Sequence, residues 1–231
     1  MKKILTYFSK GELLLWSVSV VFIIVSFMLF DKSNYLTLFV SIIGVTSLIF
    51  NAKGNPFGQL LMIIFSLFYG FISYTFAYYG EMITYLGMTA PMALFALIAW
   101  LRHPYNGNKA EVRINTLKAK EIVFMLILTL IVTALFYFIL KAFDTANLGL
   151  STLSVTTSFA AVYLTFRRSP YFAIAYAAND IVLIILWILA TLADISYLSV
   201  IICFIMFLVN DIYGFINWQR LHKKQKNHIG K

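Results

Sequence analysis

The chain has 231 residues, of which 61% are hydrophobic and 12% are charged, and its formal net charge is +9. An ordinary soluble domain is roughly 45–50% apolar and about 25% charged. A chain this apolar cannot cover its surface in water, so the composition excludes a soluble protein and predicts an integral membrane protein.

Eight segments have the length and composition of membrane-spanning helices, which need roughly 20 apolar residues. In chain order they are Leu13–Phe30, Tyr35–Asn51, Gly58–Tyr79, Met82–Leu101, Ile122–Leu140, Leu148–Phe166, Tyr171–Ala193 and Ser196–Gln219. No small-residue cleavage site follows the first segment, so we expect a retained helix and not a signal peptide. The sequence thus predicts an all-α integral membrane protein with eight transmembrane helices.

Lys and Arg are divided unevenly between the two sides of this arrangement. If the spans alternate in direction, one side carries only Lys32 and Lys141, and the other carries the remaining 16 of the 18 basic residues. Basic residues favour the cytoplasmic side, so we expect both termini in the cytoplasm and a basic tail at 221–231. A charge distribution that follows the membrane connections argues against a nucleic-acid partner. The outer loops would then hold Asp31, Glu81, Asp144 and Asp194.

An internal repeat sets the expected architecture. Each unit begins with Asn (Asn34, Asn147), runs through a Ser/Thr-rich span and closes on Trp-x-Arg, at offsets of 113 to 118 residues. We expect an extra helix at 1–33, a three-helix repeat at 34–103, a loop and linker helix at 104–146 and a second repeat at 147–220. In this 1+3+1+3 layout the two repeats are parallel, and such repeats place the substrate site between them near the midplane. Chance similarity between apolar helices is the alternative.

Two carboxylates lie well inside spans, and an ionisable group there is costly enough to suggest function. They are Asp180 and Asp211, and each follows an asparagine, Asn179 or Asn210. Helical spacing adds partners on the same or neighbouring faces. These are Tyr176 and Trp187 in the seventh span and Tyr213 and Asn217 in the eighth, with Gln59 and Tyr69 of the third span as candidates for the opposite wall.

Such a set of amides, carboxylates and flat rings suits a solute with hydroxyl groups, an amide and an aromatic ring. A cationic ring would be attracted to Trp and Tyr faces. The alternative is that these side chains brace the helix bundle through hydrogen bonds. Pro91, inside the fourth span, removes a backbone hydrogen bond and marks either a hinge or a static kink.

Motifs of enzymes and ATP-driven pumps are missing from the sequence. It contains no H-E-x-x-H, G-x-x-x-x-G-K-[ST] or G-x-S-x-G pattern, and its single cysteine, Cys203, lies in the last span. We therefore expect no enzyme, no cofactor and no metal site.

Three stretches of the sequence resemble the PnuC family of bacterial vitamin transporters. They are GEMITYLGMTAPMA at 80–93, WLRHPYNGN at 100–108 and the closing NDIYGFINWQR at 210–220. The likeness covers nearly the whole chain and is greatest to the nicotinamide riboside branch, with thiamine and riboflavin as the substrates of sister branches. It implies a fold similar to the SWEET sugar transporters, in which a linker helix joins two three-helix bundles.

The resemblance also implies a mechanism and a site. It implies facilitated diffusion of nicotinamide riboside across the bacterial inner membrane, with a separate cytoplasmic kinase trapping the solute as its phosphate. A vitamin-binding subunit that needs a separate energising complex stays open, and relatives suggest a homo-oligomer, namely a trimer. Family sites lie between the bundles, which by position here implies Asn179, Asp180, Trp187, Asn210, Tyr213 and Asn217.

Overall fold

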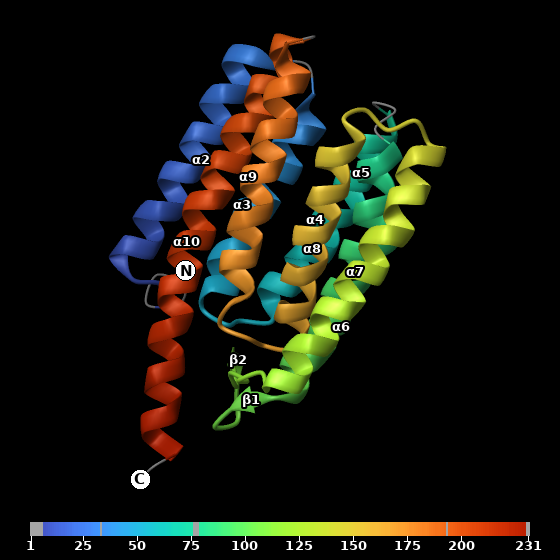
Figure 1. Cartoon of the computed structure of the whole chain (residues 1–231). Coiled ribbons are helices and arrows are strands. Elements are labelled where there is room, and N and C mark those ends of the chain that lie inside the picture. The colour runs from blue at the N-terminus through green and yellow to red at the C-terminus, as the bar shows by residue number, and fades with distance from the viewer. Residues whose placement is uncertain (1–6, 33, 76–78, 193, 230–231) are drawn as a thin grey trace.

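The computed structural model describes residues 7–32, 34–75, 79–192 and 194–229 as a bundle of long helices (Figure 1). In chain order the elements are α2 (Lys10–Phe30), α3 (Tyr35–Ala52), α4 (Phe57–Thr75), α5 (Tyr79–Thr84), the π-helical turn η1 (Tyr85–Thr89), α6 (Ala90–Arg102), β1 (Pro104–Tyr105), β2 (Asn108–Val112), α7 (Ala119–Ala142), α8 (Leu148–Phe166), α9 (Phe172–Thr191), the 3₁₀ turn η2 (Ile195–Tyr197) and α10 (Leu198–Ile229). Within those ranges eight helices are long and apolar enough to cross a membrane, which confirms the predicted fold class.

Polar residues at the span ends fix where the helices start. Ser9 and Glu12 form a reciprocal capping box at α2: the Glu12 amide donates to Ser9 Oγ (3.2 Å), and the Ser9 amide donates to the Glu12 carboxylate (2.6 Å). Asn34 begins α3 in a similar way, because its side chain accepts a hydrogen bond from the Thr37 amide (3.2 Å). Such caps satisfy N–H groups that would otherwise have no partner at a helix start.

The fourth span is irregular around its proline. It runs as Tyr79–Arg102, longer than predicted at its outer end, and consists of α5, η1 and α6. The expectation that Glu81 belongs to an outer loop is therefore wrong, because Glu81 lies in α5 within this span. Pro91 lies in the first turn of α6, directly after the π-helical turn, where its missing N–H is least costly. Its role as a hinge stays a prediction.

Six of the spans pack in a closed cycle. Helix α4 packs between α3 and α6, and α9 packs between α8 and α10. The contacts α10–α3 and α6–α8 then join the two groups, while α2 lies against α10 and α3, and α7 lies against α8 (Figure 1). In each predicted three-helix unit the middle helix, α4 or α9, therefore packs against both of the others. The two units meet at two helix pairs, α3 with α10 and α6 with α8.

Two tryptophans at the ends of the units exchange equivalent hydrogen bonds. The Trp100 indole N–H donates to the Thr165 carbonyl of α8 (2.9 Å), and that of Trp218 donates to the Asn51 carbonyl of α3 (2.8 Å). Their ring centroids are 5.4 Å apart, and both side chains are fully buried. Tryptophan beside arginine at a span end is typical of an interfacial anchor, but here both rings cap the last turn of a helix in the other unit.

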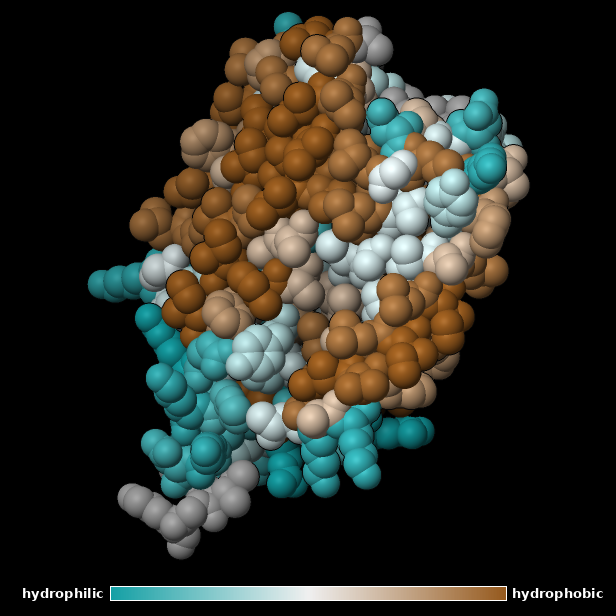
Figure 2. Space-filling model, in the orientation of Figure 1, coloured by the Kyte–Doolittle hydropathy of each residue, from teal (hydrophilic) through white to brown (hydrophobic). Residues whose placement is uncertain are grey.

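The surface divides into an apolar belt and a polar end. Hydrophobic residues cover most of the visible face, and hydrophilic residues gather at the end that carries β1, β2 and the end of α10 (Figure 2). Helix α7 exposes a lipid-facing row of large side chains that includes Leu126, Leu130 and Phe138. We expect the polar end to face the cytoplasm, in agreement with the charge distribution along the sequence.

A β-hairpin orders the connection between α6 and α7, which the sequence predicted only as a basic loop. The Gln225 amide donates to the Val112 carbonyl (3.0 Å) and accepts from the Ile114 amide (2.9 Å). The Val112 amide in turn donates to the Gly54 carbonyl between α3 and α4 (2.9 Å). Helix α10 extends to Ile229, beyond the predicted span, and so ties its polar extension to the hairpin.

Candidate functional site

Two cavities with mixed polar and apolar walls open between the helices at the end opposite the hairpin. The first, of about 410 Å³, lies between α5, η1, α8, α9 and the α7–α8 connection, and we call it the α8 cavity. The second, of about 540 Å³, lies between α3, α4, η2 and the start of α10, and we call it the α3 cavity. Trp187 of α9 lines both. Both volumes fall within the range of roughly 300–1,000 Å³ that is usual for small-molecule sites.

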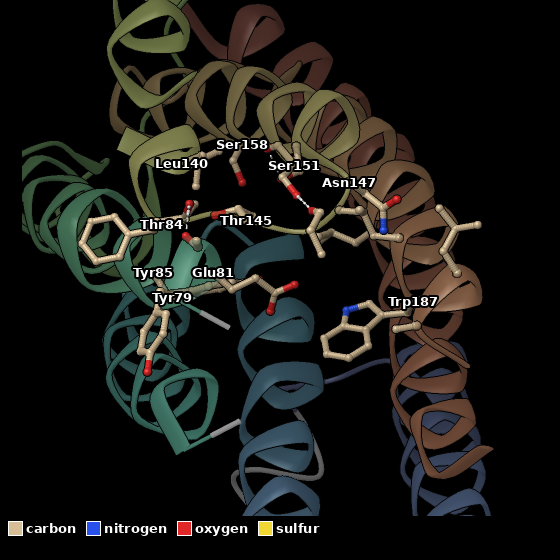
Figure 3. Close-up of a pocket in the computed structure, with 18 of the residues that line it drawn as sticks. Tyr79, Glu81, Thr84, Tyr85, Leu140, Thr145, Asn147, Ser151, Ser158 and Trp187 are labelled. Atoms are coloured by element: carbon tan, nitrogen blue, oxygen red, sulfur yellow. Dashed lines mark hydrogen bonds between the residues drawn. The ribbon is translucent and has the colours of Figure 1, made fainter. Parts of the chain in front are cut away.

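Hydroxyl groups of α8 form one wall of the α8 cavity. Ser151, Ser154 and Ser158 follow the spacing i, i+3, i+7 and therefore share one face of α8. This face lines the cavity, as Ser151 and Ser158 show in Figure 3. From the sequence, the Ser/Thr content of this span indicated only the repeat. The spacing of the three serines was the signal that could have identified them as cavity residues.

Asn179 lies on the neighbouring wall, as the sequence predicted for a substrate contact. It is buried, it lines the α8 cavity, and the Thr157 hydroxyl donates to its side-chain oxygen (2.9 Å). This hydrogen bond between α8 and α9 fixes the orientation of the amide. A fixed amide at a cavity wall is suited to recognising a polar group of a solute.

Aromatic rings separate the two cavities. The Trp187 ring lies 5.3 Å from the Tyr197 ring. Tyr69, which lines the α3 cavity, lies 4.5 Å from Tyr85 of the α8 cavity and stacks on Phe65 at 5.4 Å. Of the predicted residues, Trp187 and Tyr69 thus line the cavities with their rings.

Glu81 is another cavity residue that was not predicted from the sequence. Its side chain reaches into the α8 cavity toward Trp187 (Figure 3). The atom Oε2 is enclosed and makes no hydrogen bond of good geometry with the described residues, although the Tyr69 hydroxyl is a neighbour of this carboxyl group. Three further enclosed oxygens without a partner, those of Thr37, Tyr69 and Thr145, also belong to residues that line the two cavities. Enclosed polar atoms without partners are unusual, and their concentration here is typical of a binding site.

The carboxyl groups of Asp180 and Asp211 lie outside the cavity walls. Both residues are buried, and the two carboxyl groups lie beside each other between α9 and α10. The Tyr176 hydroxyl lies close to this pair, and Tyr85 is within electrostatic range of both Asp180 and Glu81. Tyr85, which lines the α8 cavity, thus lies between this pair and the cavity. Contact of the pair with a substrate stays a prediction.

The remaining predicted residues make hydrogen bonds between helices and do not line the cavities. Asn210 donates to Ser19 of α2 (2.9 Å), and the Tyr213 hydroxyl donates to Glu12 of α2 (2.9 Å). The other two contacts bridge to α3: Asn217 donates to the Ala52 carbonyl (2.8 Å), and Gln59 donates to Asn51 (2.8 Å). These contacts match the bracing role that was the alternative to substrate binding.

A bundle of eight spanning helices with polar cavities between its helices defines a membrane transporter by fold and site, and not an enzyme. The comparison with protein families agrees. Residues 34–220 match the family described as nicotinamide mononucleotide transporter, and the chain belongs to this family, the PnuC family that the sequence motifs resembled.

Named relatives cover most of the chain. The nicotinamide riboside transporter PnuC of Neisseria mucosa is 26% identical over 84% of this chain and 76% of its own length. The transporter of the same name from Haemophilus influenzae is 24% identical over 83% of this chain and 82% of its own. The crystal structure of the vitamin B3 transporter PnuC shares the fold, with a TM-score of 0.82 over 94% of both chains at 24% identity.

Proposed function

We propose that this transporter carries nicotinamide riboside into the bacterial cell across the inner membrane. The observation that carries the proposal is the α8 cavity, whose walls combine the Trp187 ring, serine hydroxyls of α8 and the amide of Asn179, which is hydrogen-bonded to Thr157. Nicotinamide riboside offers matching groups, namely a charged aromatic ring, a carboxamide and ribose hydroxyls. The names of the two relatives support the same substrate.

The substrate's groups can be assigned to the walls of the cavity. The pyridinium ring would lie against Trp187, because a cationic ring is attracted to an aromatic face. The carboxamide would pair with Asn179, and the ribose would contact the α8 serines. Tyr69 would close the side of the site toward the α3 cavity. The carboxyl groups of Asp180 and Asp211 would influence the charge of the site through Tyr85, without touching the substrate. The surrounding helices would be held together by the hydrogen bonds of Asn210, Tyr213, Asn217, Gln59 and Tyr176.

Transport would proceed by facilitated diffusion, with the two three-helix units moving against each other around the site. The closed cycle of contacts and the exchanged indole hydrogen bonds of Trp100 and Trp218 support a 1+3+1+3 layout of two parallel repeats. Phosphorylation of the riboside by a separate kinase would keep it inside the cell. Cytoplasmic termini, Pro91 as a hinge and assembly into a trimer are parts of the same proposal.

Isothermal titration of the detergent-purified protein with nicotinamide riboside, thiamine and riboflavin tests the substrate. Micromolar or tighter binding of the riboside, and of neither other vitamin, is the expected result. Preference for thiamine or riboflavin would keep the fold and overturn the substrate.

Uptake of labelled riboside into liposomes that contain only this protein, with no ion gradient, tests the mechanism. Equilibration across the membrane is expected for a facilitator. Binding without uptake would instead indicate a vitamin-binding subunit that needs an energising complex.

A further inference from the structure

Glu81 stands apart from the other glutamates of the chain. Glu12 pairs with Lys53 at 3.1 Å, Glu111 pairs with Lys224 at 3.5 Å, and Glu121 pairs with Arg167. Within the described residues Glu81 has no such partner, although its Oε2 atom is enclosed. The residue is half-buried and the Tyr69 hydroxyl is a polar neighbour of its carboxyl group, but no cation of the described chain neutralises it. A cationic solute in the cavity would supply the missing counter-charge.

The local packing holds Glu81 in its position at the cavity wall. At the preceding residue, Gly80, a Cβ atom would lie 2.8 Å from Leu140 Cδ2 and 2.9 Å from Thr145 Cγ2. A larger residue here would require the Leu140 and Thr145 side chains to shift, so glycine favours the close approach of α5 to the end of α7 and the α7–α8 connection. The approach encloses the Glu81 side chain between α5 and the cavity instead of leaving it in an outer loop.

Aromatic surfaces face the carboxylate across the cavity. Glu81 and Trp187 are directed toward each other from opposite walls, with Tyr85 on the same side as Glu81 (Figure 3). A carboxylate and an indole ring in the walls of one cavity favour a flat ligand whose positive charge is spread over a ring, because both groups attract that charge. Lys or Arg would suit the carboxylate equally well, but the described structure holds neither in contact with it.

We propose that Glu81 and Trp187 form a cation subsite that selects solutes with a positively charged planar ring over neutral rings of the same shape. The proposal rests on the proposed function for the identity of the substrate, but its chemistry concerns only charge. It assigns Glu81 as a specificity-determining residue that supplies the counter-charge. Neutral heterocycles would fit the same space and leave the carboxylate without a partner.

Two small probes that differ in charge test the subsite. They are 1-methylnicotinamide, which is a permanent cation, and nicotinamide, which is neutral; each is titrated against the full-length protein in detergent, with Trp fluorescence and calorimetry as readouts. We expect the wild type to bind the cation at least about tenfold more tightly than the neutral ring. Glu81→Gln should reduce this preference to about twofold or less, because the amide keeps the shape of the side chain and removes its charge.

Two further variants act as controls. Glu81→Asp, which keeps the charge, should retain a clear preference for the cation. Glu111→Gln makes the same chemical change at the hairpin and should leave the ratio of the two affinities as in the wild type. A ratio measured on one sample does not depend on the folded fraction, so partial loss of protein does not imitate the effect.

The possible results distinguish failure of the proposed subsite from failure of the proposed substrate. A wild type that binds both probes equally, or neither, overturns the subsite, and so does a Glu81→Gln variant that keeps the preference. If the cation preference depends on Glu81 but nicotinamide riboside does not bind, the subsite stands and the proposed substrate is wrong.

Discussion

The two ends of the bundle treat their polar residues in different ways. At the hairpin end, Glu12, Asn217, Trp218 and Gln225 all have hydrogen-bond partners in other elements. At the opposite end, enclosed oxygens of Glu81, Thr37, Tyr69 and Thr145 line the cavities without a partner among the described residues, against two such enclosed atoms, the Tyr105 hydroxyl and Arg168 Nε, near the hairpin. Satisfied groups hold helices together, whereas unsatisfied ones lower the cost of binding a polar solute. The difference indicates that more polar groups are available to a solute at the cavity end than at the hairpin end.

Removing the shared ring of the two cavities should have the largest effect on binding. Trp187→Ala should weaken nicotinamide riboside binding by about 2 kcal/mol or more, roughly 30-fold, because a buried aromatic contact is lost. Calorimetric titration measures the change. Trp16→Ala is the matched control, since Trp16 of α2 donates to Thr46 (3.0 Å) and lines neither cavity. An unchanged affinity in Trp187→Ala would move the site elsewhere.

Removing the indole hydrogen bonds of Trp100 and Trp218 should reduce the stability of the protein more than its affinity for the substrate. Trp100→Phe and Trp218→Phe each remove one hydrogen bond between the units, while the Thr165 and Asn51 carbonyls keep the Arg168 and Gly54 amides as donors. Each variant should therefore lose about 1 kcal/mol of stability. Thermal unfolding in detergent should show similar losses for the two variants, because the two bonds are equivalent in the repeats. A loss in one variant only would argue against parallel repeats that cap each other.

The buried carboxyl pair gives a smaller expected effect. In Asp211→Asn the amide can donate to Asp180, so the contact between α9 and α10 is kept and affinity should change by less than in Trp187→Ala. Titration of both variants under one condition compares them directly. A larger loss in Asp211→Asn would place the pair in contact with the substrate, as the sequence analysis proposed.

The smallest effect is expected at the surface of the hairpin. Lys109→Gln removes an exposed charge far from both cavities, and affinity should stay within about twofold of the wild type. The same titration serves as the measurement. A large loss would show that the basic connection binds the solute and does not only set the topology.

Much of the fold could be predicted from the sequence, because span length and hydropathy are local properties. The charge distribution and the repeat supported the same count of eight spans. The site was predictable only in part: Asn179, Trp187 and Tyr69 line the cavities, but Asn210 and Tyr213 contact α2. Whether a polar side chain meets a helix or a cavity depends on packing between distant segments, which periodicity within one helix does not contain.

Glu81 shows the opposite failure: a residue that lines the cavity was not predicted to do so. Its placement in an outer loop followed from the start predicted for the fourth span, and an error of a few residues at a helix end is enough to move a carboxylate from water to a cavity wall. The close approach at Gly80 that encloses it involves Leu140 and Thr145, which lie some sixty residues away in the sequence. Only the folded arrangement brings these residues together.

A structure of the full-length protein determined with nicotinamide riboside bound tests the central claim most directly. The account predicts the pyridinium ring in the α8 cavity, between Glu81 and Trp187, with the ribose toward the serines of α8. A riboside located instead between α9 and α10, beside Asp180 and Asp211, would contradict it.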